Sequence, residues 1–297
     1  LPDILLPIAQ ELYPKSTREK GLTAVQIFGY GRAGAAFTHA LRRRGVEVAV
    51  WNRTPRPGVD LSGALPATCR AQFWLLCVDD VALAAFVDRL AAKYQKALAG
   101  HVVLHCAGRL DSAVLAPLAK SGATVGSCHP CLSLSGQAAL TPGGWYGVEG
   151  DPDAVAWAFN LIKVLEGRGV QIPAGAKVLY HAAAVLAGNF LTTLTHGGIE
   201  LLQTLEFAEP DARALLVKLQ MTALQQLTTE EAPVALTGPF ARGDFEAIGT
   251  HVTGLASASE RVLELYRVLA EQTAEMMNWG PDDKARLQAM LASSDQS

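Results

Sequence analysis

The sequence contains a glycine motif of the kind that binds dinucleotides, Gly29-Tyr30-Gly31-Arg32-Ala33-Gly34. It follows an apolar run typical of a strand, residues 23–28, and opens a stretch with helical periodicity. Gly29 would permit the tight turn, Gly31 would let a pyrophosphate approach the backbone, and Gly34 would let the helix pack closely on the strand. The phosphates would meet the free N–H groups of the helix N-terminus. We therefore predict that residues 29–34 bind a dinucleotide.

The residues after the next apolar run indicate which dinucleotide is bound. An NAD site usually has Asp or Glu there to bind the ribose hydroxyls, but this chain reads Trp51-Asn52-Arg53-Thr54 and has no acid until Asp60. Arg53 can bind a 2′-phosphate, Thr54 can donate a hydrogen bond to it, and Asn52 suits the ribose. The pattern favours NADP (NADPH) over NAD, with a solvated surface arginine as the alternative for Arg53.

A third apolar run, residues 73–78, ends in residues that would face the same crevice. Ligands of doubly wound sheets bind at the carboxyl ends of the strands, so we expect Cys77 and Val78 to contact the cofactor, Val78 on the nicotinamide side. Asp79 or Asp80 is expected to cap the helix that follows.

A histidine stands directly after the fifth predicted strand, in Ser127-Cys128-His129-Pro130-Cys131. We expect His129 to lie near a substrate oxygen; the alternative is a histidine bonded to the backbone. Zinc needs four ligands, and no second close cysteine pair follows Cys131, while a redox Cys-x-x-Cys would open a helix. We therefore expect no metal site.

Polar residues recur along a long Ala- and Leu-rich stretch that begins at Gly175. Lys177, His181 and Asn189 share part of one helical face, because successive helical residues are about 100° apart. A later loop contains Arg242, whose guanidinium matches a carboxylate, followed by Asp244 as the expected helix N-cap. We take these side chains as candidate catalytic residues, with a surface lysine, a satisfied core histidine and a solvated arginine as the alternatives.

The elements that must position these residues change in kind along the chain. Near-continuous apolar runs alternate with helical patterns up to Ile172, which predicts a doubly wound, mostly parallel sheet covered on both faces. After Pro173 every pattern is helical. We therefore predict an α/β Rossmann domain within residues 1–172, preceded by an extension that ends near residue 21, and an all-α domain over residues 173–297. The expected strands are 23–28, 46–51, 73–78, 101–106, 123–127 and 170–172, and the expected helices include 33–44, 81–99, 112–120, 152–166, 211–228, 244–257, 259–277 and 281–292.

Composition supports a folded protein of two domains and excludes several classes of function. The 297 residues are 50% hydrophobic and 18% charged, which is unlike a disordered chain, and a net charge of −3 is unlike a nucleic-acid binder. No uninterrupted apolar run approaches the roughly 20 residues that span a bilayer, and the opening residues do not resemble a signal peptide. Five cysteines, an odd number, favour free thiols and a cytoplasmic location.

Several motifs together resemble a known group of proteins. These are Ser-x-His-Pro at 127–130, Tyr180-His181-Ala182-Ala183-Ala184 continuing to Asn189-Phe190, and Gly238-Pro239-x-x-Arg242-Gly243-Asp244 with His251. From about Leu22 onward the chain resembles the bacterial Rossmann-like oxidoreductases that have a helical C-terminal domain of uncharacterised function. That group is similar in architecture to 6-phosphogluconate dehydrogenase, pyrroline-5-carboxylate reductase and ketopantoate reductase.

The resemblance implies an NADP-dependent reductase of a small carbonyl compound or imine, of which a keto acid such as ketopantoate is one candidate. In that superfamily a lysine on the first long helix of the helical domain transfers the proton, and an asparagine follows one turn later. Here the lysine position falls on His181 and the asparagine position on Val185. Either His181 replaces the lysine as proton donor, with Asn189 further along, or Lys177 supplies the proton.

We expect hydride transfer between NADPH and the carbonyl carbon. His181 would protonate the oxygen, Asn189 and His129 would hold it, and Arg242 would bind a carboxylate. The alternatives are a prephenate-type dehydrogenase, which the Ser-x-His-Pro segment also resembles, and a non-catalytic NADP-binding sensor. We expect a homodimer formed through the helical domain, because long apolar helices commonly bury their excess surface against a second copy.

Overall fold

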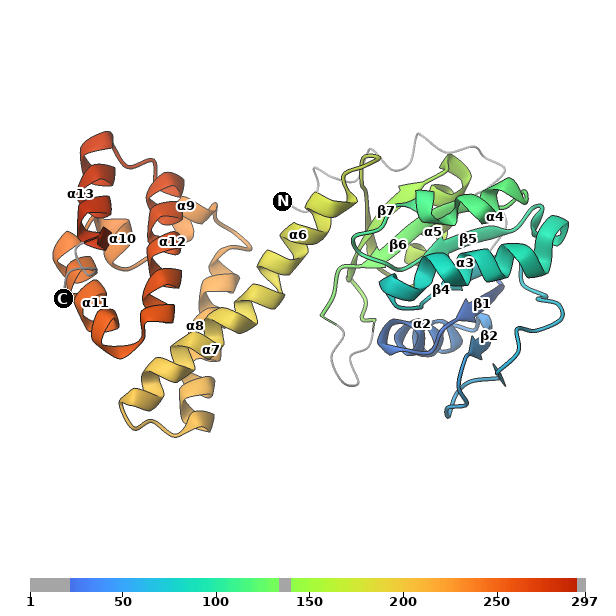
Figure 1. Ribbon diagram of the computed structural model, residues 1–297, viewed down its shortest axis with the longest axis horizontal. Coiled ribbons are helices and arrows are strands. Elements are labelled where there is room, and N and C mark those ends of the chain that lie inside the picture. Colours follow the sequence, from blue (N-terminus) through green and yellow to red (C-terminus); the bar gives the residue numbers. More distant parts are fainter. Residues whose placement is uncertain (1–21, 134–139, 293–297) are drawn as a thin grey trace. The chain divides into compact units, whose positions relative to one another are not determined.

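The computed structural model describes residues 22–133 and 140–292 (Figure 1). The predicted N-terminal extension lies outside the described residues. The chain divides into two compact units, one that ends at Gly188 and one that begins at Asn189.

The first unit is built on one sheet of eight strands. They are β1 (Ala24–Phe28), β2 (Glu47–Asn52), β3 (Leu61–Ser62), β4 (Phe73–Leu76), β5 (Val102–His105), β6 (Thr124–Pro130), β7 (Trp145–Gly150) and β8 (Arg168–Gln171). Their order is β3-β2-β1-β4-β5-β6-β7-β8, and every neighbouring pair is parallel except β6 with β7. The chain therefore extends the sheet first to one side of β1 and then to the other, which is the doubly wound order.

Helices cover both faces of this sheet (Figure 1). They are α2 (Arg32–Arg42), α3 (Asp80–Tyr94), α4 (Ala116–Lys120) and α5 (Pro152–Val164), with two short 3₁₀ turns at Gln95–Leu98 and Ser112–Leu115. Apolar residues of α2 and α5 share one buried cluster with Leu75, whereas those of α3 and α4 share another with Leu76. Successive strand residues point to opposite faces, so a strand buried on both faces must be apolar throughout. This explains the continuous apolar runs, and the predicted fold class is confirmed.

The far edge of the sheet differs from the prediction. β6 continues through Pro130, so His129 lies within a strand and not after one. Two strands, the short β3 and the six-residue β7, are absent from the sequence-based prediction. β7 carries glycines at 147 and 150 and lacks a regular alternation of apolar and polar residues, which is why its sequence does not signal a strand. Its antiparallel pairing with β6 positions the polar residues described below.

The second unit is helical throughout its described residues. Its helices are α7 (Asn189–Thr204), α8 (Glu209–Gln226), α9 (Ala232–Ala235), α10 (Pro239–Arg242), α11 (Phe245–Ala258), α12 (Glu260–Met276) and α13 (Pro281–Ala292). Its core is an apolar cluster of α11, α12 and α13 that includes Ile248 and Leu287. The predicted N-cap at Asp244 is confirmed, because its Oδ1 accepts a hydrogen bond from the Ala247 N–H at 3.1 Å. A side chain at this position typically stabilises a helix by about 1 kcal/mol.

Helix α6 (Lys177–Ala187) belongs to the first unit, although it follows the predicted domain boundary at Pro173. The boundary between domains therefore stays a prediction. By length and composition alone, the helical stretch of 28 residues at 177–204 could cross a membrane, since an 18-residue window within it has a mean hydropathy of 1.3. The stretch also includes Lys177, whose amine is hydrogen-bonded inside the first unit, and a buried lysine is costly in lipid.

Candidate functional site

The glycine turn between β1 and α2 is shaped by contacts that only glycine allows. Gly29 has a positive φ of 99°, and a Cβ there would collide with the carbonyl of Cys77, which directly follows the neighbouring strand β4. A Cβ at Gly34 would collide with the carbonyl of Gly29. Gly31, in contrast, borders open space, so the backbone is approachable at the point where a phosphate would need to come close to the start of α2.

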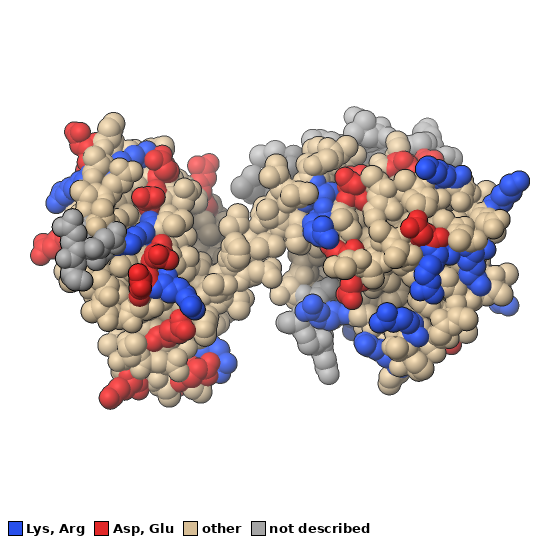
Figure 2. All heavy atoms as spheres, in the orientation of Figure 1, with Lys and Arg blue, Asp and Glu red and all other residues tan. Residues whose placement is uncertain are grey.

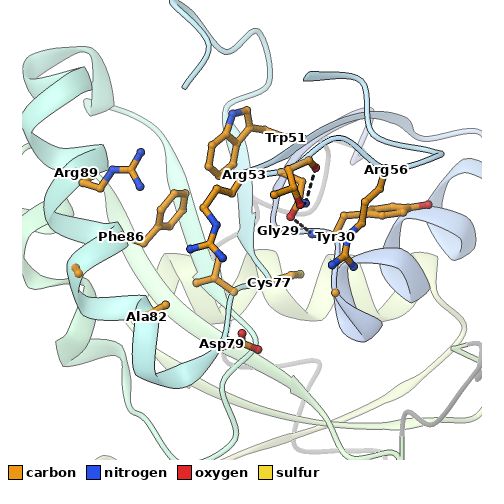
Figure 3. A pocket seen from close by; sticks show the side chains of 15 residues that line it. Gly29, Tyr30, Trp51, Arg53, Arg56, Cys77, Asp79, Ala82, Phe86 and Arg89 are labelled. Carbon is orange, nitrogen blue, oxygen red and sulfur yellow. Dashed lines mark hydrogen bonds between the residues drawn. The ribbon is translucent and has the colours of Figure 1, made fainter. Parts of the chain in front are cut away.

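A cavity of about 380 Å³ opens in front of this turn (Figure 3). Its wall is formed by the glycine turn, the end of β2 with the loop after it, the end of β4 and one side of α3. The lining residues are Gly29, Tyr30, Gly31, Trp51, Asn52, Arg53, Thr54, Arg56, Cys77, Val78, Asp79, Ala82, Ala85, Phe86 and Arg89. Most of the predicted cofactor residues thus meet in one cavity, whereas Arg32, Ala33 and Gly34 form the start of α2 and do not line it.

Asn52 is oriented toward the glycine turn. Its Oδ1 accepts a hydrogen bond from the Tyr30 N–H at 3.0 Å, and its Nδ2 donates to the Thr54 carbonyl at 2.8 Å. The side chain therefore joins the turn to the loop after β2 and fixes where that loop begins. The sequence assigns Asn52 to the ribose and gives no sign of this bracing between the two segments.

The cavity contains more positive charge than the sequence analysis predicts. Arg53 extends across it in Figure 3, with Arg56 beside Tyr30 and Arg89 beside Phe86 on α3. The aromatic rings behind these arginines are packed against one another, since Trp51 and Phe86 stack with ring centroids 5.4 Å apart. Arg56 could have been found as the second cation of the same loop, whereas Arg89 is brought in only by the packing of α3.

A second group of polar residues lies at the ends of β5 and β6, and Cys77 links it to the cavity. The Sγ atoms of Cys77 and Cys106 are 3.4 Å apart. Burial raises the pKa of the Cys106 thiol well above its ordinary value, and the neighbouring Cys77 adds to this effect. Cys106 is therefore a neutral thiol at neutral pH.

His129 and His181 meet beside Gly108. A Cβ at Gly108 would collide with the His181 ring and lie 2.9 Å from Nε2 of both histidines, and the two ring centroids are 5.9 Å apart. Nδ1 of His129 is hydrogen-bonded to the Tyr180 hydroxyl at 3.0 Å. The three residues, from β6 and α6, form a half-buried polar cluster (His129, Tyr180 and His181), of which the sequence predicts only the histidines.

Gly147 makes room for this cluster. A Cβ there would lie 2.7 Å from the Tyr180 hydroxyl and 2.6 Å from Cδ1 of Ile172. The glycine that hides β7 from sequence-based prediction is thus required for the tyrosine that orients His129. A glycine inside a strand often marks such a close approach, and this signal was present in the sequence.

Lys177 is a buried cation behind the polar cluster. Only 1% of it is exposed, and its Nζ donates to the Ala107 carbonyl at 3.0 Å. Burial lowers the pKa of Lys177 from its ordinary value, while the charge of Glu149 acts in the opposite direction. A buried ammonium is costly without partners, and its field reaches the neighbouring histidines. Lys177 does not present its amine to solvent.

His129 and His105, two histidines near Lys177, are neutral at physiological pH. Burial lowers the pKa of His129 to about 4, with further contributions from the charges of Lys177 and His181. Burial and Lys177 lower the pKa of His105 to about 3. The His105 ring is fixed by the Asp111 carbonyl at Nε2 and the Ala107 N–H at Nδ1, at 3.2 and 3.1 Å. His129 is therefore a neutral hydrogen-bonding group and not a protonated imidazolium.

Glu149 on β7 contributes a buried carboxylate near Lys177. The sequence analysis misses this residue because it misses the strand that carries it. Glu149 is 7% exposed, and its two oxygens accept hydrogen bonds from the Ser112 N–H at 2.8 Å and the Ser112 hydroxyl at 2.6 Å. The Ser127 hydroxyl lies 3.5 Å from the same carboxylate. The glutamate joins β6, β7 and the turn at Ser112, and supplies the negative charge that favours protonated Lys177.

The two remaining candidate catalytic residues belong to the second unit, whereas the polar cluster lies in the first. Asn189 begins α7 and Arg242 ends α10, both in the second unit, where Arg242 lies 3.7 Å from Asp244. Their roles stay predictions.

The predicted capping by Asp79 or Asp80 needs a correction: Asp79 is the N-cap residue of α3, but its side chain accepts no capping hydrogen bond. Asp80 instead lies 3.4 Å from Arg109.

The two halves of the chain match two described families. Residues 14–130 match a Rossmann-like domain, and residues 145–273 match DUF2520, a domain of unknown function. The protein is thus a Rossmann-fold protein with a helical C-terminal part. More particularly, it joins a Rossmann-like domain to a DUF2520 domain, which confirms the resemblance seen in the sequence. No curated protein matches the sequence.

Solved structures share this fold at low sequence identity. A provisionally assigned NADP oxidoreductase of Bacteroides fragilis is 20% identical, with a TM-score of 0.69 over 85% of this chain and 98% of its own. The reductive aminase of Aspergillus terreus, solved with NADPH and ethyl levulinate, is 20% identical with a TM-score of 0.63 over 90% and 99%. The imine reductase of Streptomyces aurantiacus is 19% identical with a TM-score of 0.56 over 92% and 94%.

Proposed function

We propose that this protein is an NADPH-dependent oxidoreductase that reduces a small carbonyl or imine compound. The observation that carries the proposal is the cavity in which the glycine turn and the arginine-bearing loop after β2 meet. The turn offers backbone N–H groups to a pyrophosphate, and Arg53 with Thr54 offers partners to a 2′-phosphate. Reductases with the same fold, such as the reductive aminase above, support this assignment.

The residues present fit NADPH. Gly31 leaves open space where a pyrophosphate would approach the backbone, and no acidic side chain follows β2 until Asp60, which is paired with Arg42 at 2.8 Å. Val78 and Cys77 would border the nicotinamide end of the bound cofactor. When bound, NADPH supplies the hydride; the protein supplies position, charge and a proton.

Among the clustered polar residues, we assign the proton donor to His181. Its ring lies beside Gly108 and remains partly accessible, whereas the amine of Lys177 is buried behind the Ala107 carbonyl. A general acid must come within hydrogen-bond reach of the atom that it protonates. His129, held by Tyr180, would hydrogen-bond the substrate oxygen or nitrogen as a neutral imidazole. Lys177 would act through its charge on His129 and His105.

Calorimetry with NADPH and NADH tests the cofactor assignment. Arg53→Ala should weaken NADPH binding by about tenfold, because a charge-assisted contact to phosphate is lost, and should leave NADH binding nearly unchanged. Arg43→Ala, an exposed arginine that ends α2 outside the cavity, is the matched control and should change neither affinity. An unchanged preference for NADPH in Arg53→Ala would contradict the phosphate assignment.

We further propose that the protein acts as a homodimer in a reducing compartment. Helix α8 carries exposed apolar side chains, including Leu219 at 62% and Met221 at 59% exposure. Dense apolar surface of this kind on a helix favours contact with a second copy. All five cysteines are free, which supports a cytoplasmic location.

A further inference from the structure

The loop that carries Arg53 and Arg56 is solvent-exposed along nearly its whole length, yet it is fixed at its beginning, middle and end. Residues 53–60 are all exposed except Val59. An exposed loop of this kind would ordinarily sample many conformations, and its arginines would lose that freedom when they bound a phosphate. The contacts that hold the loop before any ligand binds are therefore relevant to affinity.

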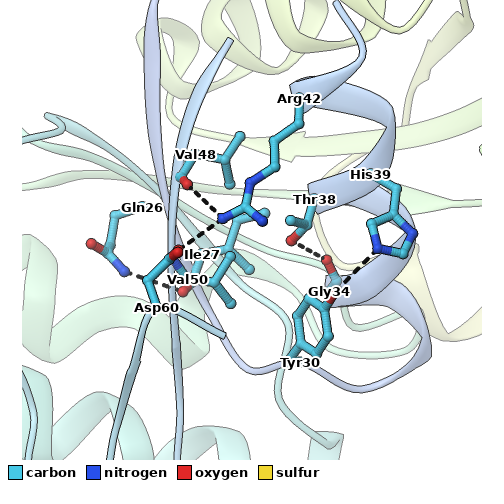
Figure 4. Close-up of polar contacts among 10 residues, drawn as sticks. All are labelled: Gln26, Ile27, Tyr30, Gly34, Thr38, His39, Arg42, Val48, Val50 and Asp60. Atoms are coloured by element: carbon cyan, nitrogen blue, oxygen red, sulfur yellow. Dashed lines mark hydrogen bonds and ion pairs between the residues drawn. The ribbon is translucent and has the colours of Figure 1, made fainter. Parts of the chain in front are cut away.

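The end of the loop is fixed by Asp60 (Figure 4). Its Oδ2 accepts two hydrogen bonds, from the Val50 N–H at 2.7 Å and from Nη2 of Arg42 at 2.8 Å. The same Arg42 nitrogen donates to the Val48 carbonyl at 3.0 Å. Asp60 thus ties the loop to the backbone of β2 and, through Arg42, to the last turn of α2.

The middle of the loop rests on the glycine turn. Gly58 has a φ of +88°, and a Cβ there would collide with the hydroxyl of Tyr30. That hydroxyl is hydrogen-bonded to Nε2 of His39 on α2 at 3.2 Å, a contact that Figure 4 also shows. At its beginning the loop is held by the Asn52 amide, as described above. The arginines are therefore carried by a loop that is already in place.

We propose that Asp60 is a positioning residue for NADP selectivity, which acts through the loop on Arg53 and Arg56. The inference rests on the proposed function. Preorganisation strengthens binding because the ordering cost is met on folding and not on association. Only a ligand that uses the loop arginines gains from it, so NADPH should depend on Asp60 and NADH should not.

The sign of the expected effect separates this role from simple electrostatics. A carboxylate near a phosphate would repel it, so removal of an unpaired Asp60 would strengthen NADPH binding. Asp60 is paired with Arg42 and directed at the β2 backbone. If it acts as an anchor, its removal weakens NADPH binding despite the lost negative charge.

The experiment measures dissociation constants of the full chain for NADPH and NADH by calorimetry. Asp60→Ala should raise the constant for NADPH by about tenfold and change that for NADH by less than about twofold. Asp60→Asn keeps an acceptor for the Val50 N–H and should give a smaller loss of the same kind. In a background of Arg53→Ala with Arg56→Ala, Asp60→Ala should have no further effect, because the groups that it positions are gone.

Two further variants provide a second test of the anchoring role and a control. Gly58→Ala disturbs the middle of the loop without altering charge and should reproduce the selective loss of NADPH affinity, should Asp60→Ala fold poorly. Glu209→Ala breaks a comparable exposed pair with Arg213 in the second unit, 3.1 Å apart, and should change neither constant.

The possible failures are distinguishable. Unchanged selectivity in Asp60→Ala, equal losses for both nucleotides, or stronger NADPH binding would overturn the anchoring role while leaving the proposed function intact. An additional loss from Asp60→Ala in the background that lacks both loop arginines would also overturn it. If the wild-type protein binds neither nucleotide, the proposed function itself is wrong, and the inference falls with it.

Discussion

At the scale of single residues, the two candidate proton donors, His181 and Lys177, differ in how accessible they are. His181 and His129 flank Gly108, whereas the Lys177 amine is turned to the Ala107 carbonyl and is 1% exposed. Both histidines are half-buried, whereas the lysine is fully buried. This arrangement favours His181 over Lys177 as the proton donor that we propose.

Replacement of His181 tests that assignment. With a keto acid, ketone or imine that the wild type reduces, His181→Ala should lower kcat by about 10²–10⁴-fold, the usual contribution of a general acid, with NADPH affinity nearly unchanged. His196→Ala removes an exposed histidine of the second unit and serves as the control. Equal loss of turnover and NADPH affinity would contradict a catalytic role.

Lys177→Met distinguishes the rival assignment in the same assay. If the lysine only sets the charge around the histidines, the variant should retain more activity than His181→Ala. The pKa of His129 should also rise in it, because a nearby positive charge has been removed. A loss larger than that of His181→Ala, without the change at His129, would identify Lys177 as the donor.

The neutral histidines also predict how stability depends on pH. His129 and His105 have folded-state pKa values of about 4 and about 3, below the roughly 6.5 of an unfolded histidine. In the window between these values the unfolded chain binds the extra protons, so the free energy of unfolding should fall as the pH falls from about 6.5 toward 4. Each histidine can contribute a slope of at most about 1.4 kcal/mol per pH unit.

Urea unfolding at pH 7 and pH 5 measures this effect. The wild type should lose stability over the interval, and His129→Gln should lose less, because it lacks one of the two titrating groups. His251 is exposed, with its Nδ1 hydrogen-bonded to the Tyr266 hydroxyl at 3.0 Å, and offers the control His251→Gln, which should keep the wild-type slope. A slope in His129→Gln equal to that of the wild type would show that His129 is not buried as a neutral group.

At the scale of elements, the sequence predicts most of the first unit and misses the edge that builds the polar cluster. The central strands are apolar on both faces, so β1, β2, β4 and β5 are recognisable from their continuous runs, and the glycine turn from its spacing. β7 is not, because Gly147 and Gly150 interrupt it. Those glycines are needed for close approaches that only the folded sheet creates, at Tyr180 and at the Gly126 backbone.

Contacts that arise only on folding also decide which site residues can be predicted from the sequence. Arg53 and Cys77 immediately follow recognisable strands or end them, so their place at the carboxyl edge can be predicted. Arg89, Glu149 and Tyr180 reach the site through the packing of α3, β7 and α6, which no local pattern specifies. Asp60 is the clearest case, because the sequence identifies it only as an acid too far along to bind ribose, whereas the structure shows it holding the loop.

At the scale of the whole molecule, the protein has side chains of both charges on its surface and exposed apolar side chains on α8. Figure 2 shows acidic and basic side chains interspersed over the visible faces of both units, in keeping with a net charge of −3. Six apolar side chains of α8 and its C-cap are from 40% to 62% exposed: Leu215, Val217, Leu219, Met221, Leu224 and Leu227.

If a second copy covers this surface, charge introduced there should separate the dimer. Sedimentation velocity of the wild type should give twice the chain mass of 31.4 kDa, and Leu219→Glu with Met221→Glu should shift it to the monomer, because a charge buried in an apolar interface is costly. Val170→Glu places the same charge on an exposed apolar residue of β8 in the first unit and should leave the dimer intact. A wild type that sediments as a monomer at tens of micromolar would refute the homodimer. A dimer that survives the double substitution, with melting temperatures unchanged, would place the contact elsewhere than on α8.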